Sequence, residues 1–348
     1  MPTENETRRE RYPLPIKDRG YVAFAADNAG ARALLREAIH ELSPTEIMPL
    51  SLRYEDEELL LRLISTLQTR LPPEETNRIS FQIADTLDPQ PEWKPLPELF
   101  GEVGGRSVAE MILHRLFTTY MQPIVQSGGS IEGYEFLLRP LPELAPFRPA
   151  NLFETARRSG QHAFLDRAAR RSAIRLGASH LSPGTKRFIN FLPSSLHEPD
   201  ECLRGTFDFI RESGTSAQDY VFEVMETERL DDPALGYVFD VARSQGVQLA
   251  LDDVGSGFAT LHTVDRLKPD YVKMDRRWVS GCDADEAKQR YIDDLLHRVA
   301  KFGGTVLAEG VEREEEWRYL RQAGIPLFQG FLFGRASPVP AGMSASSR

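Results

Sequence analysis

The amino-acid sequence predicts an α/β fold: a TIM-like (βα)8 barrel with an antiparallel first strand, preceded by a small α/β N-terminal unit. The first observation is that short apolar runs alternate with amphipathic helical patterns, which is typical of α/β barrels. The second is that only residues 126–130 separate the first two runs. The third is the number of runs, which is eight: 121–125, 131–139, 187–192, 220–226, 247–253, 271–275, 305–309 and 327–334.

The N-terminal unit is predicted for residues 21–100, after a polar tail at 1–20 that we expect to be disordered. Its apolar residues alternate as in strands at two places and recur with helical spacing at two others. The expected elements are strands at 21–25 and 78–84 and helices at 28–42 and 55–71. Asn28 can cap the first helix, because an asparagine side chain accepts hydrogen bonds from the free N–H groups there. A regulatory role is one interpretation of this unit.

A segment rich in proline and glycine, 88–105, is expected to link this unit to a barrel domain at 101–348. A helix is expected at 107–120, before the first barrel strand. Asp85 directly follows the strand at 78–84. A structural or capping role is favoured over that of a phosphoacceptor, because the segment is short for a whole receiver domain and shows no matching acidic pair and lysine.

The connection between the first two barrel strands determines their relative direction. Residues 126–130, Gln-Ser-Gly-Gly-Ser, are too few for a parallel crossover, which needs about a dozen residues or more. These strands should therefore form a hairpin, with the first strand antiparallel to the others. Helical patterns between the later strands allow parallel connections, and they lie at 151–160, 235–246, 285–303 and 312–324.

Composition and charge narrow the classes of partner. The 348 residues include 42 Lys and Arg against 52 Asp and Glu, and the net charge of −10 argues against binding to duplex nucleic acid or to a membrane. No run approaches the ~18 apolar residues of a membrane span, and residues 1–20 lack the apolar core of a signal peptide. Cys202 and Cys282 give neither a disulfide framework nor zinc spacing. The expected location is cytoplasmic.

Polar residues interrupt the predicted strands near their carboxyl ends, where barrel enzymes place their active sites. A lone acid at a strand end is usually solvated or paired with a basic neighbour, and two aspartates before a glycine often belong to a turn. A whole set of such residues on six strands is much harder to explain by structural roles. The set is Glu135, Asn190, Glu223, Asp252, Asp253, Lys273 and Glu309.

This set predicts a metal centre. Carboxylate and amide oxygens, without histidine or cysteine, suit a hard cation such as Mg²⁺ or Mn²⁺. Two cations about 4 Å apart are a common device for hydrolysing phosphodiesters. The cations would also neutralise the repulsion between the adjacent carboxylates of Asp252 and Asp253, and one of these carboxylates could bridge both ions.

The motifs around these residues resemble those of the EAL-domain cyclic di-GMP phosphodiesterases. The run Gly-Tyr-Glu-Phe-Leu-Leu-Arg-Pro is similar to the family signature Glu-x-Leu-x-Arg, here Glu135, Leu137 and Arg139. The resemblance covers about residues 108–338. The other matching segments, in the family's order, are QPIV, FINFLPSSL, FEVMETE, LDDVGSGFATL, DYVKMD, LAEGVE and FQGFLFG.

The resemblance implies hydrolysis of cyclic di-GMP to linear pGpG with two cations, Mg²⁺ or Mn²⁺, in each active site. A water between the cations would attack one phosphorus, and Lys273 would hold that water or help to deprotonate it. Catalytic roles fall on Lys273, Glu309 and Glu135. The implied cation ligands are Glu135, Asn190, Glu223 and Asp252 for one ion, and Asp252, Asp253 and Glu309 for the other.

The resemblance also implies the residues that contact the substrate. Arg139 would grip a phosphate, as guanidinium groups do well. Gln122, Leu138 and Gln329 would lie along the substrate. Glu226 would brace the loop of the two aspartates, and because this loop can form part of a dimer interface in the family, a homodimer is expected.

Three residues depart from the family pattern. Phe136 stands where alanine is usual, Val254 where phenylalanine is usual and Ser256 where threonine is usual. Because side chains alternate along a strand, Phe136 should point away from Glu135. Val254 puts regulation through the aspartate loop in question.

Three functions are open at this point: an active phosphodiesterase, a catalytically silent effector that binds cyclic di-GMP, and another metal-dependent barrel enzyme. Silent members of the family usually lack several metal or lysine positions, and none is lost here, which favours the enzyme. The sequence has no His-Asp dipeptide, no Gly-x-Ser-x-Gly elbow and no phosphate-binding loop with Lys-Ser/Thr, so other hydrolase classes lack support.

Overall fold

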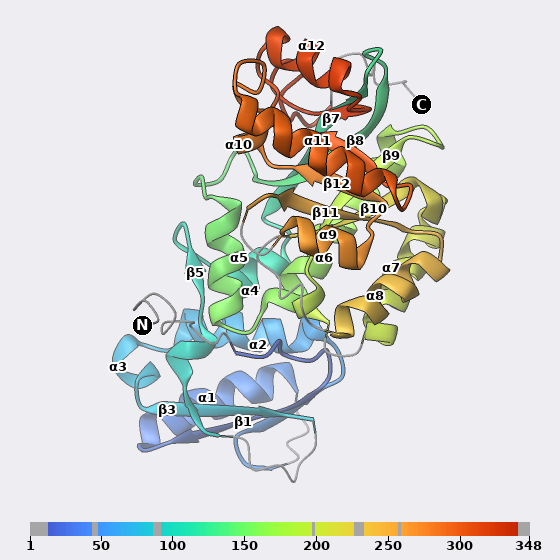
Figure 1. Ribbon diagram of the computed structural model, residues 1–348. Coiled ribbons are helices and arrows are strands. Elements are labelled where there is room, and N and C mark those ends of the chain that lie inside the picture. The colour runs from blue at the N-terminus through green and yellow to red at the C-terminus, as the bar shows by residue number, and fades with distance from the viewer. Residues whose placement is uncertain are drawn as a thin grey trace, which may run out of the picture. The chain divides into compact units, whose positions relative to one another are not determined.

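The computed structural model describes residues 13–43, 48–85, 92–196, 199–225, 233–256 and 259–339. The described residues gather into two compact units, whose elements are labelled in Figure 1. The first unit comprises the chain up to residue 118 together with 139–168. The second comprises 119–138 and the chain from residue 169.

The first unit contains a four-stranded antiparallel sheet in the order β2-β1-β3-β4. The strands are β1 (Gly20–Ala26), β2 (Ser51–Tyr54), β3 (Ile79–Ala84) and β4 (Lys94–Pro95). Burial alternates along β1, where Val22 and Phe24 are buried, so one face of the sheet carries apolar side chains. Helices α1 (Ala29–Leu42) and α2 (Glu57–Arg70) pack against each other and against these strands, and the short α3 (Pro73–Thr76) follows.

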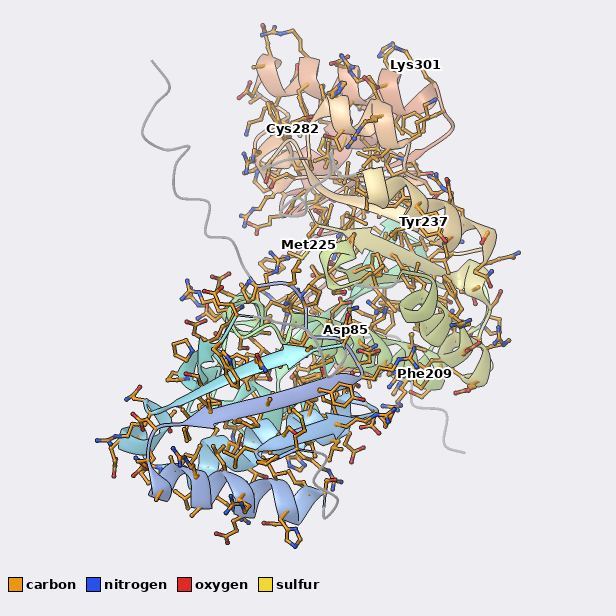
Figure 2. All side chains as sticks on the ribbon, turned by 90° about the horizontal axis from the view of Figure 1, so that it is seen from below. Asp85, Phe209, Met225, Tyr237, Cys282 and Lys301 are labelled. Carbon is orange, nitrogen blue, oxygen red and sulfur yellow. The ribbon has the colours of Figure 1, made fainter. Side chains whose placement is uncertain are left out.

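Polar side chains determine where α1 and α2 begin. Asn28 Oδ1 accepts a hydrogen bond of 2.7 Å from the N–H of Ala31, which confirms the predicted cap of α1. Asp56 caps α2 in the same way, by accepting from the N–H of Leu59 at 3.0 Å. Asp85 forms an ion pair with Lys17 at 2.6 Å, which agrees with its expected structural role (Figure 2).

This part of the chain differs from the sequence-based expectations at three places. Strand β2 is not predicted by the sequence, because four residues carry too little alternation to be recognised. The expected linker is packed where the structure describes it, since Leu96 and Leu99 are buried and β4 pairs with β3. The helix expected at 107–120 is only α4 (Val108–Leu113), because Arg115 takes a left-handed conformation (φ 50°) and strand β7 follows. The division of the chain at residue 100 stays a prediction.

The second unit is built on a closed barrel of eight strands, as predicted. The order around the barrel is β10-β11-β12-β13-β14-β7-β8-β9. Strand β7 is antiparallel to β14, and the neighbours from β8 round to β14 are parallel, so the first strand does run against the others. The strands are β7 (Phe117–Gln126), β8 (Ile131–Pro140), β9 (Lys186–Phe191), β10 (Tyr220–Val224), β11 (Gln248–Val254), β12 (Tyr271–Met274), β13 (Thr305–Ala308) and β14 (Leu327–Phe328).

Helices connect the parallel strands and cover the barrel (Figure 1). Among the described residues of this unit, a large apolar cluster joins the strands to the helices, and a small one fills the barrel itself. Helix α6 is continuous and contributes residues to both compact units. Helix α5 (Pro149–Arg158) belongs to the first unit, where it contacts α4 and the short strand β5 (Glu102–Val103). The later helices are α6 (His162–His180), α7 (Pro199–Glu212), α8 (Pro233–Ser244), α9 (Leu261–Leu267), α10 (Arg276–Val279), α11 (Glu286–Ala300) and α12 (Glu314–Ala323).

Candidate active site

Every barrel strand places one polar or charged residue directly above the apolar filling of the barrel. Alternation along a strand returns the side chain to the same face after two residues. The inner apolar layer is made of Ile124, Phe188, Val221, Ala250, Tyr271, Leu307 and Leu327, with Gly133 as the eighth inner position. Two residues further toward the same end of the barrel stand Gln122, Asn190, Glu223, Asp252, Lys273, Glu309, Gln329 and Glu135.

Lys273 lies at the centre of this polar layer. Its side chain is 1% exposed, and its Nζ lies within ion-pair distance of four carboxylates from four different strands or strand ends. An ammonium has three N–H donors, so it cannot direct one at each carboxylate at the same time. The distances from Nζ are 2.7 Å to Glu223, 2.8 Å to Asp252, 2.9 Å to Glu309 and 3.4 Å to Glu135.

Burial and charge perturb the acids in this layer. Burial raises the pKa of Glu223 well above 4.5, and the attraction of Lys273 opposes this shift. Burial raises the pKa of Glu309 above 4.5 in the same way, with repulsion from Asp252 adding to it. Burial acts to lower the pKa of Lys273, but the four surrounding carboxylates outweigh it and raise that pKa well above 10.5.

The two aspartates reach the same site because the backbone departs from regular strand geometry between them. In a regular strand, Asp252 and Asp253 would point to opposite faces. The pairing of β11 with β12 shifts its register between Leu251 and Val254, and Asp253 has a left-handed φ of 48°. This bulge turns Asp253 back, so one carboxylate oxygen each of Asp252, Asp253 and Glu309 lies within 4.8 Å of the others.

The donor set fits divalent cations. Five carboxyl groups gather here against one ammonium, so their full ionisation would leave a large excess of negative charge in a poorly solvated place. Glu223 Oε2 is buried and has no hydrogen-bond partner among the described residues, as expected for an atom that would bind an ion. Asn190 pairs in register with Glu223 on the neighbouring strand, so it contributes an amide to the same layer. All these ligand atoms are oxygens, which hard cations prefer.

Neutral side chains complete the layer. Gln329 donates a hydrogen bond of 2.6 Å from its Nε2 to Glu135, which orients this acid. Gln122 donates to the backbone oxygen of Gly334 at 3.2 Å.

Gly330 was missed in the sequence, yet a Cβ there would lie 2.0 Å from the backbone oxygen of Val311. Only glycine allows this close approach, and the signal was a glycine directly after a polar residue in an apolar run.

The remaining predicted residues are placed as follows. Leu138 and Arg139 are half-buried near the end of β8. Arg139 belongs to the first compact unit and the acids to the second, so its contact with a phosphate stays a prediction. Glu226 lies outside the described residues, which end at Met225 and resume at residue 233. Phe136 is buried in the outer apolar cluster, which confirms that it points away from Glu135.

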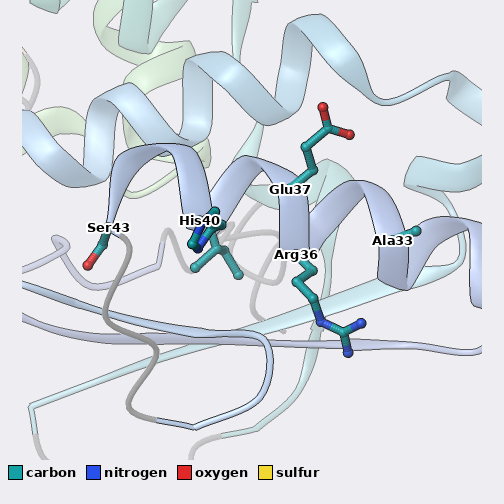
Figure 3. Close-up of a pocket in the computed structure, with 6 residues that line it drawn as sticks. Ala33, Arg36, Glu37, His40 and Ser43 are labelled. Carbon is teal, nitrogen blue, oxygen red and sulfur yellow. The ribbon is translucent and has the colours of Figure 1, made fainter.

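A pocket lies along α1 in the first unit, far along the chain from these acids (Figure 3). It is lined by Ala33, Arg36, Glu37, Ile39, His40 and Ser43. Its charged side chains are exposed, and no cluster of buried polar groups stands behind them among the described residues. The polar layer of the barrel is therefore the candidate site.

Known proteins similar to this chain share the barrel. The family model described as EAL domain matches residues 106–336. A relative from Escherichia coli named probable cyclic di-GMP phosphodiesterase PdeG is 33% identical over 62% of this chain and 43% of its own length. Cyclic di-GMP phosphodiesterase PdeL, from the same organism, is 26% identical over 64% of this chain and 63% of its own length. The chain thus spans less than two thirds of these curated relatives.

Two solved structures agree with these relatives. A standalone EAL protein from Vibrio cholerae in a c-di-GMP-bound form has a TM-score of 0.59 at 29% identity, and the match covers 66% of this chain and 96% of that protein. Klebsiella pneumoniae BlrP1, in a complex with manganese and cyclic di-GMP, has a TM-score of 0.58 at 30% identity over 64% of this chain and 56% of its own. In the part of this chain that the structure describes, no helix is long and apolar enough to cross a membrane.

The left-handed conformation of Asp253 can be tested by comparing Asp253→Asn with Asp253→Ala. Both remove one negative charge from the cluster, but asparagine tolerates positive φ whereas alanine does so at a cost of about 1–2 kcal/mol. In chelator, we expect the Asn variant to be at least as stable as the wild type and the Ala variant to be about 1 kcal/mol or more less stable than the Asn variant. Urea unfolding measures this, and equal stabilities would contradict the bulge geometry.

The raised pKa of Glu309 predicts a pH dependence of stability. Above pH 4.5 the unfolded chain releases this proton while the folded, metal-free protein retains it. The stability contributed by Glu309 is therefore complete below pH 4.5 and is lost as the pH rises through the raised pKa. In chelator, the free energy of unfolding of the wild type should therefore fall relative to that of Glu309→Gln as the pH rises from 4.5 through the raised pKa of Glu309.

The matched control is Glu286→Gln, because the Glu286 side chain is 88% exposed. Denaturant unfolding at a series of pH values gives each difference. If the plots of unfolding free energy against pH for the wild type and Glu309→Gln ran parallel from pH 4.5 to neutrality, the inference that burial and repulsion raise the pKa of Glu309 would be wrong.

Proposed function

The chain belongs to the EAL domain family, and from this membership we propose that it hydrolyses cyclic di-GMP to linear pGpG with the help of divalent cations. The observation that carries the proposal is the polar layer of the barrel, in which four carboxylates surround Lys273 and a fifth, that of Asp253, lies beside two of them. Silent members of the family usually lack several of the metal or lysine positions, and this chain keeps all of them, which supports turnover.

The choice of substrate rests on the relatives. Two similar phosphodiesterases are named for cyclic di-GMP, and two similar structures hold that dinucleotide. A cyclic dinucleotide carries two phosphodiesters, and its negative charge suits a site whose excess acids are neutralised by cations. The cations we propose are Mg²⁺ or Mn²⁺, two in each site, in accordance with the manganese present in one of these structures.

Bound divalent cations would polarise the phosphodiester and lower the pKa of a water nucleophile. The chain's own residues supply the rest. Glu135, Asn190, Glu223 and Asp252 would hold one ion, and Asp252, Asp253 and Glu309 the other. Lys273 would orient the attacking water by donating hydrogen bonds from Nζ, because its ammonium is held at the centre of the acids.

The substrate-binding residues in this proposal are Gln122, Leu138, Arg139 and Gln329. Gln329 donates a hydrogen bond to Glu135, so a change in the orientation of the Gln329 amide would change the orientation of the Glu135 carboxylate. Arg139 would neutralise one phosphate with its guanidinium. We also propose, from the family resemblance, that Glu226 braces the aspartate turn and that the protein acts as a homodimer.

The proposal predicts metal-dependent hydrolysis. Pure protein incubated with cyclic di-GMP should form linear pGpG with Mg²⁺ or Mn²⁺, and excess EDTA should abolish it, because the acids without cations repel the phosphate. Calcium should bind but support little turnover. Liquid chromatography of the nucleotides measures product. Full activity in chelator would refute the metal-dependent reaction, whereas tight binding of cyclic di-GMP with no product would favour a silent effector.

Lys273→Met provides a second test. It removes the ammonium but keeps a side chain of similar length, so turnover should fall by orders of magnitude, on the order of 10²-fold or more, while cyclic di-GMP still binds. The buried acids also lose their counter-charge, which should destabilise the metal-free protein by about 3 kcal/mol or more. Added Mg²⁺ should recover part of that stability.

The control for this variant is Lys301→Met, since Lys301 is exposed at the end of α11 (Figure 2). Nucleotide chromatography and urea unfolding, with and without Mg²⁺, separate the two effects. Normal turnover in Lys273→Met would exclude Lys273 from the reaction.

A further inference from the structure

Trp278 and Tyr291 form a stacked aromatic pair beside the turn that carries the two aspartates. Their ring centroids lie 3.7 Å apart and their planes differ by 9°. Trp278 belongs to α10 and Tyr291 to α11, which lie side by side (Figure 1). Both rings are only partly buried, so the pair forms the edge of the apolar cluster rather than its centre.

The pair fits closely against Gly255. A Cβ on this residue would lie 2.1 Å from Trp278 Nε1 and 2.7 Å from the Tyr291 hydroxyl. The indole N–H also points to the backbone oxygen of Gly255 at 3.4 Å. Gly255 has a φ of 99°, which is available to glycine but strained for other residues. The aromatic pair therefore occupies the space that a side chain at this position would need.

Gly255 is connected to Asp253 by the tight turn that follows β11. The N–H of Ser256 donates to the backbone oxygen of Asp253 at 3.0 Å, and the N–H of Gly255 donates to that of Ala259 at 2.8 Å. The carboxylate of Asp253 lies beside those of Asp252 and Glu309, although these like charges repel each other. A left-handed aspartate among like charges stays in place only if its surroundings hold it there.

We propose that Trp278 and Tyr291 are positioning residues for Asp253: by holding Gly255, they keep the aspartate turned into the site and so set the affinity for the divalent cation at Asp252, Asp253 and Glu309. This inference rests on the proposed function in that it takes a divalent cation as the ligand. The pair touches the backbone of the turn and acts on the cation through Asp253.

The test is a titration of the full chain with Mn²⁺ in the absence of nucleotide, followed by calorimetry. Trp278→Leu removes the stack and the indole N–H, and it should raise the Mn²⁺ dissociation constant about 10-fold, the effect typical of groups that orient a metal ligand. Tyr291→Phe keeps the stack and should stay within about twofold of the wild type. The matched control is Trp317→Leu, which disrupts aromatic contacts with Phe328 and Phe333 instead.

A double variant shows whether Trp278 acts through Asp253. In an Asp253→Asn background, Trp278→Leu should change the Mn²⁺ dissociation constant by less than about twofold, because the group that it positions is gone. Equal effects of Trp278→Leu and Trp317→Leu, or an undiminished effect in the Asp253→Asn background, would overturn the inference.

The same titration separates the inference from the proposed function. A wild-type chain that binds Mn²⁺ and responds to Trp278→Leu as expected, yet forms no pGpG, refutes only the proposed hydrolysis. A wild-type chain that binds no Mn²⁺ overturns the positioning role together with the metal-dependent mechanism.

Discussion

The buried ammonium of Lys273 among four carboxylates is the interaction on which the site depends. Carboxylates that are buried together repel each other and lose their hydration. Both effects disfavour the ionised form, so such carboxylates take up protons or destabilise the folded protein. Lys273, within 2.7–2.9 Å of three of these carboxylates, offsets part of that repulsion in the folded protein. The remaining negative charge is what a divalent cation would bind, so the same imbalance that costs stability provides affinity.

Along the barrel axis, the apolar residues that stabilise the fold and the polar residues of the candidate site occupy successive layers. The inner apolar layer packs closely, as in the edge-to-face contact of Phe188 with Tyr271 at 5.0 Å. Two residues further on, every strand changes to a polar side chain, and there the backbone also becomes irregular. Asp253 takes a left-handed φ, and Gly330 approaches the backbone of Val311 more closely than any side chain allows. These irregular positions rest on a regular layer that holds the strands in register.

One departure from the family pattern is accommodated locally. Phe136, where alanine is usual, points into the outer cluster, and its ring reaches to 3.0 Å from the place where a Cβ on Gly177 of α6 would be. A glycine on the helix thus makes room for a larger residue on the strand. Helix α6, like β7 and β8, contributes residues to both compact units, and Arg167 near its start forms ion pairs with Asp18 and Glu57 within the first unit.

The sequence by itself determined the barrel, its antiparallel first strand and the polar residues above its core, because alternation, run length and loop length are local properties that a strand must satisfy wherever it lies. It did not reveal the short strand β2 or the true end of α4, since four residues carry little periodicity and a left-handed arginine leaves no pattern. Only the tertiary structure decided that Lys273 lies at the centre of the acids, that Asp253 turns back beside Asp252, and that Trp278 stacks on Tyr291 against Gly255. These contacts join residues far apart in the chain or depend on one dihedral angle, and closure of the barrel brings them together.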